Sequence, residues 1–294
     1  VQPKDKASKE GASYTYTDVV TEPGVYVYRI KAVSYNNKSF NPEEMTVNVA
    51  PAQGTGEIQY GRLSVDNDQP NEVYFSEAFE EAPCVFIGTV TNKNTKFLFG
   101  NNLSASDKTK FSFQMLPWQT NTGSGDKNEE VPFLALKPGN YTYGDVACEV
   151  GSAKSGKATT YNYTDTMEVA FVQPFADGVT PIVVTEIKKP GYSSATALSV
   201  RVFDVTNASF KLIVYSEDKA NKKVALQQTV NYLAIAPGFA YADEENGIMI
   251  AAGYGSNQIY GLTAQEVTFT AGNDTLKLNA PVVLNQLQTK NYPT

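Results

Sequence analysis

The chain repeats itself, and this repeat constrains the fold more than any other feature of its 294 residues. The tetrapeptide EVYF at 72–75 returns as EVAF at 168–171, an offset of 96 residues. The run PFLALKPG at 132–139 returns as NYLAIAPG at 231–238, an offset of 99 residues. Differences in loop length between related modules produce such small changes of offset. The sequence therefore contains one module at least twice.

A third copy begins near the C-terminal end. The tetrapeptide EVTF stands at 266–269, and Pro281 follows it as Pro83 and Pro181 follow the earlier tetrapeptides. The repeats accordingly divide the chain into a first copy, a second copy and the first two strands of a third, at residues 57–153, 157–260 and 264–294. We expect both ends of the sequence to fall inside a module and to leave unpaired strand edges.

Each copy has the residue pattern of β-strands. The segment 200–215 alternates between apolar and polar residues on both sides of a Thr-Asn-Ala-Ser cluster, which predicts a hairpin with one buried face. The run at 232–236 is continuously apolar and is stopped by Pro237 and Gly238. No capped helical pattern of ten residues occurs. About six short strands per copy predict an all-β chain of tandem antiparallel β-sandwiches.

The first 51 residues differ from the repeats. A Tyr16-x-Asp18 pair precedes a turn, and the alternating run from Gly24 to Val33 is followed by a strand that ends at Val49. This pattern resembles the second half of a fibronectin type III domain over about 40 residues. The resemblance implies a partial module over 1–51 that strands outside the sequence would complete.

The repeats resemble a second family, through residues that are mostly apolar and at core positions. In the first copy they are Phe75, Phe79, Pro83, Phe111 and 133–139, and in the second Phe171, Phe175, 181–184, 200–202, Phe210 and 232–238. They are similar to repeats of secreted multidomain proteins of Bacteroidota, related in pattern to the H-type lectin domain. The resemblance implies six-stranded antiparallel sandwiches and, by analogy, recognition of carbohydrate. No sugar-binding residue set carries over to these loops.

Composition narrows the function. The sequence has no histidine, which excludes Ser-His-Asp and Cys-His nucleophiles and the common zinc sites. A net charge of −7 argues against nucleic-acid or anionic-membrane partners. No apolar run reaches the length of a membrane span. We therefore expect a non-catalytic protein that needs no cofactor.

The two cysteines allow two interpretations. Cys84 aligns with Ile182, and Cys148 falls near Met249 or Ile250. Positions that a sister copy fills with large apolar residues are core positions, so the cysteines are buried free thiols or a disulfide across the sandwich. Two such residues without histidine do not make a metal site.

Trp118 is the only tryptophan and stands beside a loop rich in Gly, Ser and Asn. A flat aromatic ring at such a loop is either a stacking platform for a sugar or an anchor that packs the loop onto the module.

Two further patterns are weaker. Asp66 and Asp68 offer oxygen ligands at short spacing, but they lack the rest of an EF-hand loop, so a turn held by their side chains is favoured over a calcium site. Thr166 and Thr275 each stand between an aspartate and an aliphatic residue, which resembles an O-glycosylation motif of Bacteroidota.

Together these observations predict a modular region of a large secreted or cell-surface bacterial protein that is adhesin-like and binds polysaccharide or surface glycans. Its other expected partners are flanking modules of its own chain. Two alternatives remain: spacer modules of a giant surface protein or of a polysaccharide-degrading enzyme, and a client of bacterial surface or export machinery such as type IX secretion.

Overall fold

The chain folds into small β-sheets. The computed structural model describes residues 24–29, 44–49, 57–65, 70–91, 98–104, 107–117, 129–157, 163–189, 198–216, 227–243, 248–254, 270–271, 274–275 and 282–286. These residues form strands joined by turns and extended segments, and no helix occurs among them. None of them accordingly belongs to a helix long and apolar enough to cross a membrane. The all-β class predicted from the sequence is confirmed.

The first repeat forms a β-sandwich-like unit. Its strands are β3 (Ile58–Val65), β4 (Pro70–Tyr74), β5 (Cys84–Ile87), β6 (Leu98–Ser104), β7 (Lys110–Pro117) and β8 (Glu129–Leu136). They pair antiparallel in the orders β3-β8-β5 and β4-β7-β6. Apolar side chains of both sheets meet in one buried cluster that includes Leu63, Phe111 and Phe133. This unit is called the first sandwich below.

The second repeat has the same strand order. Its strands are β9 (Gly139–Tyr143), β10 (Val146–Lys154), β11 (Met167–Ala170), β12 (Ile182–Lys189), β13 (Leu198–Phe203), β14 (Ser209–Ser216) and β15 (Thr229–Ile235). They form the sheets β12-β15-β10-β9 and β11-β14-β13, which make up the second sandwich. The predicted hairpin over 200–215 is confirmed as the antiparallel pair β13 and β14.

Strand pairing places the boundary between the first and second repeats closer to the N-terminus than the ranges 57–153 and 157–260 do. β10, assigned by those ranges to the first copy, pairs with β15 and β9 and so belongs to a sheet of the second sandwich. A turn at Pro138-Gly139 leads from β8 into β9, and Gly139 has a φ of 149°. Its counterpart Gly238, which begins β16 (Gly238–Asp243), has a φ of 153°. Both glycines occupy backbone that other residues rarely adopt, so the two copies leave the sandwich by the same turn.

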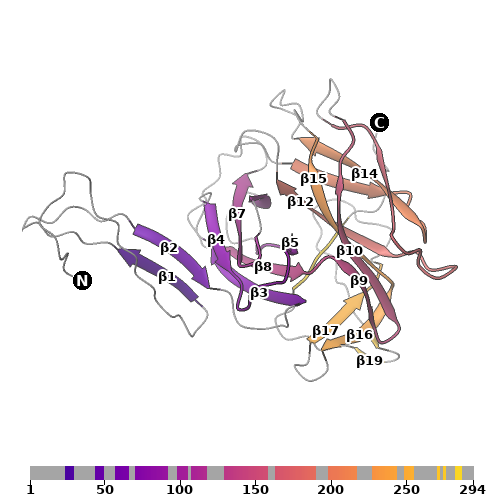
Figure 1. Cartoon of the computed structure of the whole chain (residues 1–294), viewed down its shortest axis with the longest axis horizontal. Coiled ribbons are helices and arrows are strands. Elements are labelled where there is room, and N and C mark those ends of the chain that lie inside the picture. The colour runs from indigo at the N-terminus through magenta and orange to yellow at the C-terminus, as the bar shows by residue number, and fades with distance from the viewer. Residues whose placement is uncertain are drawn as a thin grey trace, which may run out of the picture.

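The N-terminal strands extend the first sandwich at its edge. β1 (Gly24–Arg29) and β2 (Glu44–Val49) form an antiparallel hairpin, as the alternating sequence predicts. β2 also pairs in parallel with β4 through Asn48 opposite Val73 and Val49 opposite Tyr74. In Figure 1 this hairpin reaches away from both sandwiches.

One of the two apolar clusters reaches from one sandwich into the other. The sheet β3-β8-β5 is apolar on both faces: Val85 and Phe133 face the core of the first sandwich, whereas Phe86 and Leu136 belong to the cluster of the second. Figure 1 shows this sheet beside the strands β10, β12 and β15. The two sandwiches therefore share buried apolar surface, which favours association of modules as it favours folding within one.

Among the described residues after β15, two further pairs of strands are antiparallel. β16 pairs with β17 (Ile248–Ala252), and β18 (Thr270–Ala271) pairs with β19 (Asp274–Thr275). In the repeat alignment β16 and β17 correspond to β9 and β10. Register places Val150 opposite Gly139 and Ala252 opposite Gly238, so Cys148 corresponds to Ile250, as the sequence predicts.

Candidate functional site

Of the residues singled out in the sequence, the structure describes Cys84, Cys148, Thr166 and Thr275. Trp118, Asp66 and Asp68 lie outside the described residues. Thr166 is exposed just before β11, and Thr275 ends β19. The interpretations of these five residues remain predictions. Among the described residues, no group of three or more Cys, Asp or Glu side chains could hold a metal ion.

The two cysteines are buried free thiols. A disulfide between them is not formed, and β5 and β10 place them in different sandwiches. Cys84 corresponds to Ile182, because each stands opposite the last residue of the central strand, Leu136 or Ile235. Burial raises the pKa of both thiols, that of Cys148 to about 12. The cysteines therefore act as small apolar side chains.

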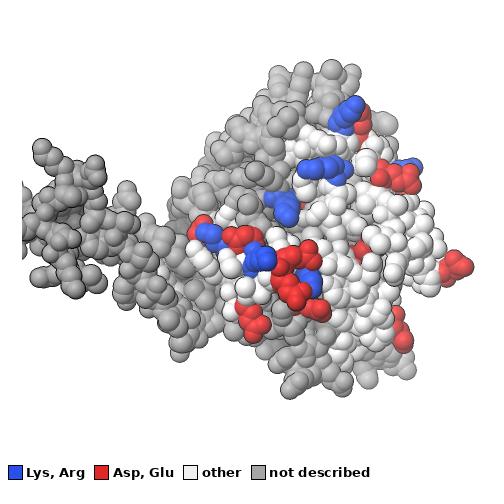
Figure 2. Space-filling view, viewed as in Figure 1, with Lys and Arg blue, Asp and Glu red and all other residues white. Residues whose placement is uncertain are grey.

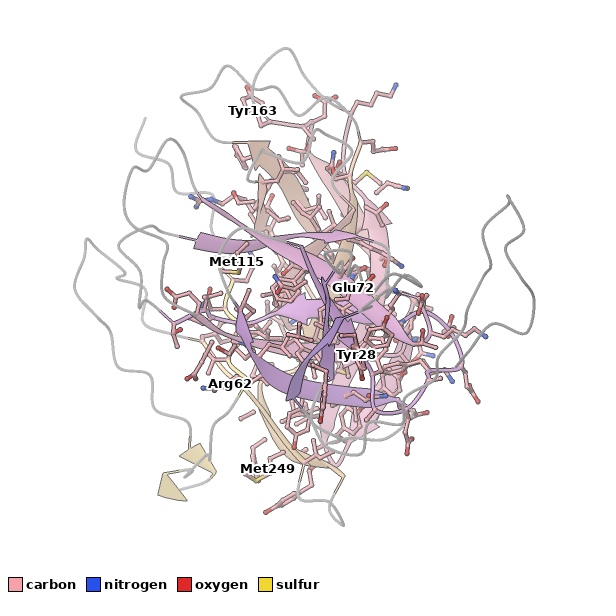
Figure 3. All side chains as sticks on the ribbon, turned by 90° about the vertical axis from the view of Figure 1, so that its left-hand side faces the viewer. Tyr28, Arg62, Glu72, Met115, Tyr163 and Met249 are labelled. Atoms are coloured by element: carbon pink, nitrogen blue, oxygen red, sulfur yellow. The ribbon has the colours of Figure 1, made fainter. Side chains whose placement is uncertain are left out.

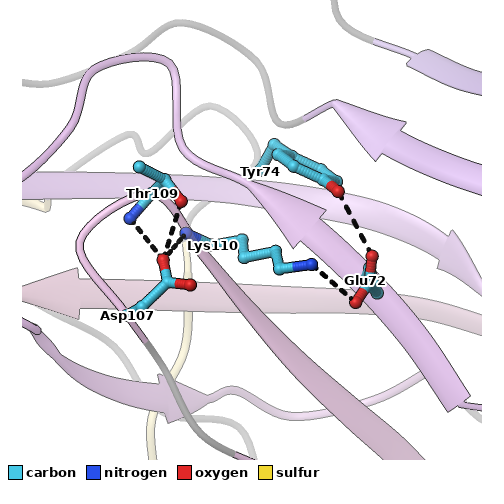
Figure 4. A network of polar contacts seen from close by, with 5 residues as sticks. All are labelled: Glu72, Tyr74, Asp107, Thr109 and Lys110. Carbon is cyan, nitrogen blue, oxygen red and sulfur yellow. Dashed lines mark hydrogen bonds and ion pairs between the residues drawn. The ribbon is translucent and has the colours of Figure 1, made fainter. Parts of the chain in front are cut away.

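A polar network lies on the surface of the first sandwich (Figure 4). Asp107 Oδ1 accepts hydrogen bonds from the amides of Thr109 and Lys110, at 2.6 and 2.9 Å, and so closes the turn before β7. Lys110 Nζ then donates to Glu72 Oε1 at 2.9 Å and lies over the ring of Tyr74. These contacts stabilise a turn and two strands.

The second sandwich repeats this network with different residues. Thr206 Oγ1 accepts from the amides of Ala208 and Ser209, where Asp107 accepts in the first sandwich. Ser209 Oγ donates to Glu168 Oε1 at 2.9 Å, where Lys110 donates to Glu72. The turn contacts are thus part of how each repeat folds, and they do not distinguish a binding site.

A buried polar side chain anchors the loop that follows β4 in the first sandwich and β11 in the second. In the first sandwich Gln59 Oε1 accepts from the amide of Ser76 at 3.0 Å. In the second, Glu149 Oε2 accepts from the amide of Val172 at 2.9 Å, and its Oε1 accepts from the Tyr232 hydroxyl at 2.7 Å. Gln59 and Glu149 occupy equivalent positions, each beside the residue that pairs with the end of the central strand.

We expect Glu149→Ala to lower the free energy of unfolding by about 2–4 kcal/mol, because it leaves a buried hydroxyl and backbone donors without an acceptor. Glu149→Gln is expected to lose less than half as much, since an amide oxygen serves the equivalent loop at Gln59. Urea denaturation followed by tyrosine fluorescence measures both. Equal losses in the two variants would show that the charge of Glu149, and not its role as acceptor, stabilises the loop.

The junction between the sandwiches is the most distinctive site. β5 is the outer strand of its sheet, so alternate residues turn backbone groups away from β8. The carbonyl oxygen of Val85 accepts a hydrogen bond of 3.2 Å from Asn231 Nδ2. The amide of Ile87 donates to Glu186 Oε2, also at 3.2 Å. Side chains of the second sandwich thereby close the strand edge of the first.

The groups that close this edge form a row across three strands. Ser152, Asn231 and Glu186 stand opposite one another in β10, β15 and β12. Ser152 Oγ donates to Asn231 Oδ1 at 2.8 Å, which orients the amide toward β5. At the same junction, Cys84 Sγ of β5 lies 3.4 Å from the carbonyl oxygen of Gly151 in β10. The row is called the junction row below.

Glu186 is buried in the junction. Burial raises the pKa of Glu186 to about 8, against the opposing effect of the amide donors of Ile87 and Ile187. At neutral pH the buried side chain is therefore mainly the neutral acid, which avoids an unpaired charge between the sandwiches. The arrangement binds an extended backbone edge, and it has the chemistry of an interface between modules.

Sequence reasoning missed the junction row. Glu186 and Asn231 stand on the outer face of a sheet, where polar residues ordinarily meet water. A signal was present in the alignment of the copies: Asn231 corresponds to Pro132 and Glu186 to Gly88. At both positions the first copy has a residue whose side chain has no hydrogen-bond donor or acceptor, and the second copy has Asn or Glu. Such a change indicates that this face of the sheet packs against a different neighbour in each copy.

In Figure 2, basic and acidic side chains are interspersed over the described part of the face that is drawn. Figure 3 places Tyr163 and Met249 at opposite ends of the molecule, with Met115 and Glu72 between them. The exposed aromatic residue Tyr163 thus lies away from the hairpin of β16 and β17.

Comparison with known proteins found no matching family model, no matching curated protein and no matching solved structure.

Proposed function

We propose that this chain is a non-catalytic modular region of a secreted or cell-surface bacterial protein, and that its sandwiches serve as a stiff spacer. The observation that supports this function is the junction, where Phe86 and Leu136 of one sandwich belong to the apolar cluster of the other. Modules joined by a flexible linker do not share a core. A shared core holds the two modules at a fixed angle. Domains attached to the two ends of the chain would therefore be held at a fixed distance from each other.

The finer fold assignments belong to the same proposal. The repeats are H-type-lectin-like sandwiches of the kind found in secreted proteins of Bacteroidota, and β1 and β2 belong to a partial fibronectin type III module. Both assignments rest on the residue patterns quoted above. The absence of histidine supports a non-catalytic role.

Glycan binding is the second candidate function, and one observation favours it. Tyr163 is 36% exposed, and its ring lies 5.9 Å from that of Tyr215 at an interplanar angle of 47°. The exposed ring of Tyr163 offers an apolar face to a sugar, and the half-buried ring of Tyr215 supports it. The pair lies only in the second sandwich, so it does not make the repeats as a whole a binding array.

Small-angle X-ray scattering combined with a glycan array distinguishes the two functions. A spacer is expected to give the scattering of one rigid body containing both sandwiches, and no saturable glycan binding. Scattering that requires independently moving sandwiches would contradict the spacer. Saturable binding that Tyr163→Ala or Trp118→Ala abolishes would instead establish a lectin, and the identity of the sensitive variant would locate the sugar.

A further inference from the structure

The segment 282–286 belongs to the third repeat and corresponds to β5 and β12. A proline precedes each of the three segments, at Pro83, Pro181 and Pro281. Counting from these prolines, Glu186 and Gln286 both stand at the fifth residue. The second and third repeats thus carry a side chain with an acceptor oxygen at the same position of the same strand.

The same two positions are in contact in both pairs of successive copies, through a backbone amide donor in one pair and a side-chain hydroxyl donor in the other. In the first junction Glu186 accepts from the amide of Ile87, the fourth residue after Pro83. In the second, Gln286 Oε1 accepts from Thr185 Oγ1 at 2.7 Å, and Thr185 is the fourth residue after Pro181. Each contact therefore joins the fourth residue of one repeat to the fifth residue of the next.

A second contact places the segment in the same way. β12 lies against β6 of the first sandwich. β13 is the counterpart of β6, and Gln286 Nε2 donates to the carbonyl oxygen of Val200 in β13 at 2.9 Å. The segment 282–286 thus meets the second sandwich through the strands that correspond to those by which β12 meets the first.

The first repeat differs at the same position. Its fifth residue is Gly88, and a Cβ atom there would lie 2.8 Å from Pro132 Cγ and 2.8 Å from the carbonyl oxygen of Val283. Val283 also accepts a hydrogen bond from the amide of Thr89 at 2.8 Å. The first repeat follows a unit of another kind, and it carries no acceptor side chain at this position.

We propose that the edge of β12, together with β13, is a docking surface for a following sandwich of the same repeat, and that Gln286 is the residue that seats it. This inference rests on the proposed spacer function and names its partner: the next copy, with an acceptor side chain at the fifth residue after its proline. The first junction uses a buried carboxyl group at this position, and the second uses a half-buried amide. In both cases the acceptor comes from the fifth residue after the proline of the later copy.

Hydrogen exchange on the full chain, measured by mass spectrometry, tests the proposed docking surface. Gln286→Ala is expected to speed exchange in peptides covering β12 and β13 by about tenfold, the effect of losing roughly one or two hydrogen bonds. Peptides covering β7 serve as an internal control and are expected to be unchanged. Gln286→Glu retains an acceptor and is expected to remain within about threefold of the natural chain.

Thr185→Val supplies the partner variant, because it removes the hydroxyl donor and retains the shape of the side chain. The double variant Thr185→Val/Gln286→Ala is expected to exchange no faster than Gln286→Ala alone, since both substitutions break the same contact. Unchanged exchange in Gln286→Ala, or effects of the two substitutions that simply multiply, would overturn the proposed docking surface. Neither result alters the scattering of the first two sandwiches, so the spacer function would be judged separately.

Discussion

Phe86→Ala is expected to lower the free energy of unfolding by about 3–5 kcal/mol, and to separate the unfolding of the two sandwiches. Phe86 is 1% exposed and stands in β5 of the first sandwich, yet it belongs to the core cluster of the second. Its removal leaves a cavity in the surface that the sandwiches share. In the natural chain we expect one cooperative transition, because neither sandwich can unfold without exposing part of the other's core.

Phe113→Ala is the matched control. Phe113 is also 1% exposed, but it belongs only to the core of the first sandwich. We expect a similar loss of stability with less change in coupling, so differential scanning calorimetry should resolve two transitions more clearly in Phe86→Ala. If both variants give the same single transition at a lower temperature, the junction contributes nothing particular to cooperativity. If the natural chain already shows two separate transitions, the shared core does not couple the sandwiches.

The second large effect concerns pH. Glu186 has a pKa of about 8 in the folded chain and near 4.5 when unfolded. The folded chain therefore holds this proton more tightly, and its contribution to stability is complete below about pH 4.5 and is lost as the pH rises to about 8. The difference corresponds to at most about 5 kcal/mol. Urea denaturation at pH 5 and pH 8.5 should show the decline.

Glu186→Gln removes the titrating group and keeps an oxygen that accepts from the amide of Ile87. We expect the variant to lack most of the decline and to be more stable than the natural chain at pH 8.5. Glu168→Gln is the control, because it makes the same chemical change at an exposed position in β11, outside the junction. The same decline in Glu186→Gln as in the natural chain would show that another group titrates.

The sequence was sufficient for the class of fold and the repeating unit, because both depend on patterns along the chain. Alternation over 200–215 predicted β13 and β14 correctly, and the alignment of Cys84 with Ile182 matches their positions in the sheets. The boundary of the unit was harder to predict. A periodic sequence can be divided at any point of its period, and only the pairing of β10 with β15 shows which sandwich that strand joins.

The junction could not be predicted for a different physical reason. Whether Asn231 and Glu186 face water or another module depends on how the modules pack, and the alternation within one strand carries no information on that packing. An apolar run such as that at 84–87 is typical of a strand buried on both faces, and β5 is such a strand. The run did not reveal that the second covering layer is the neighbouring sandwich.

The closed edge of β5 also has a consequence for synthesis. Val85 and its partner Asn231 are 146 residues apart in the chain. At about 5–20 residues per second, the ribosome adds that length in roughly 7–30 seconds. The first sandwich can complete its own two sheets well before then, with the backbone of β5 still bare. During that interval a nascent chain on one ribosome offers an unsatisfied strand to its neighbour on the same messenger, and chaperones that shield such strands would act in this window.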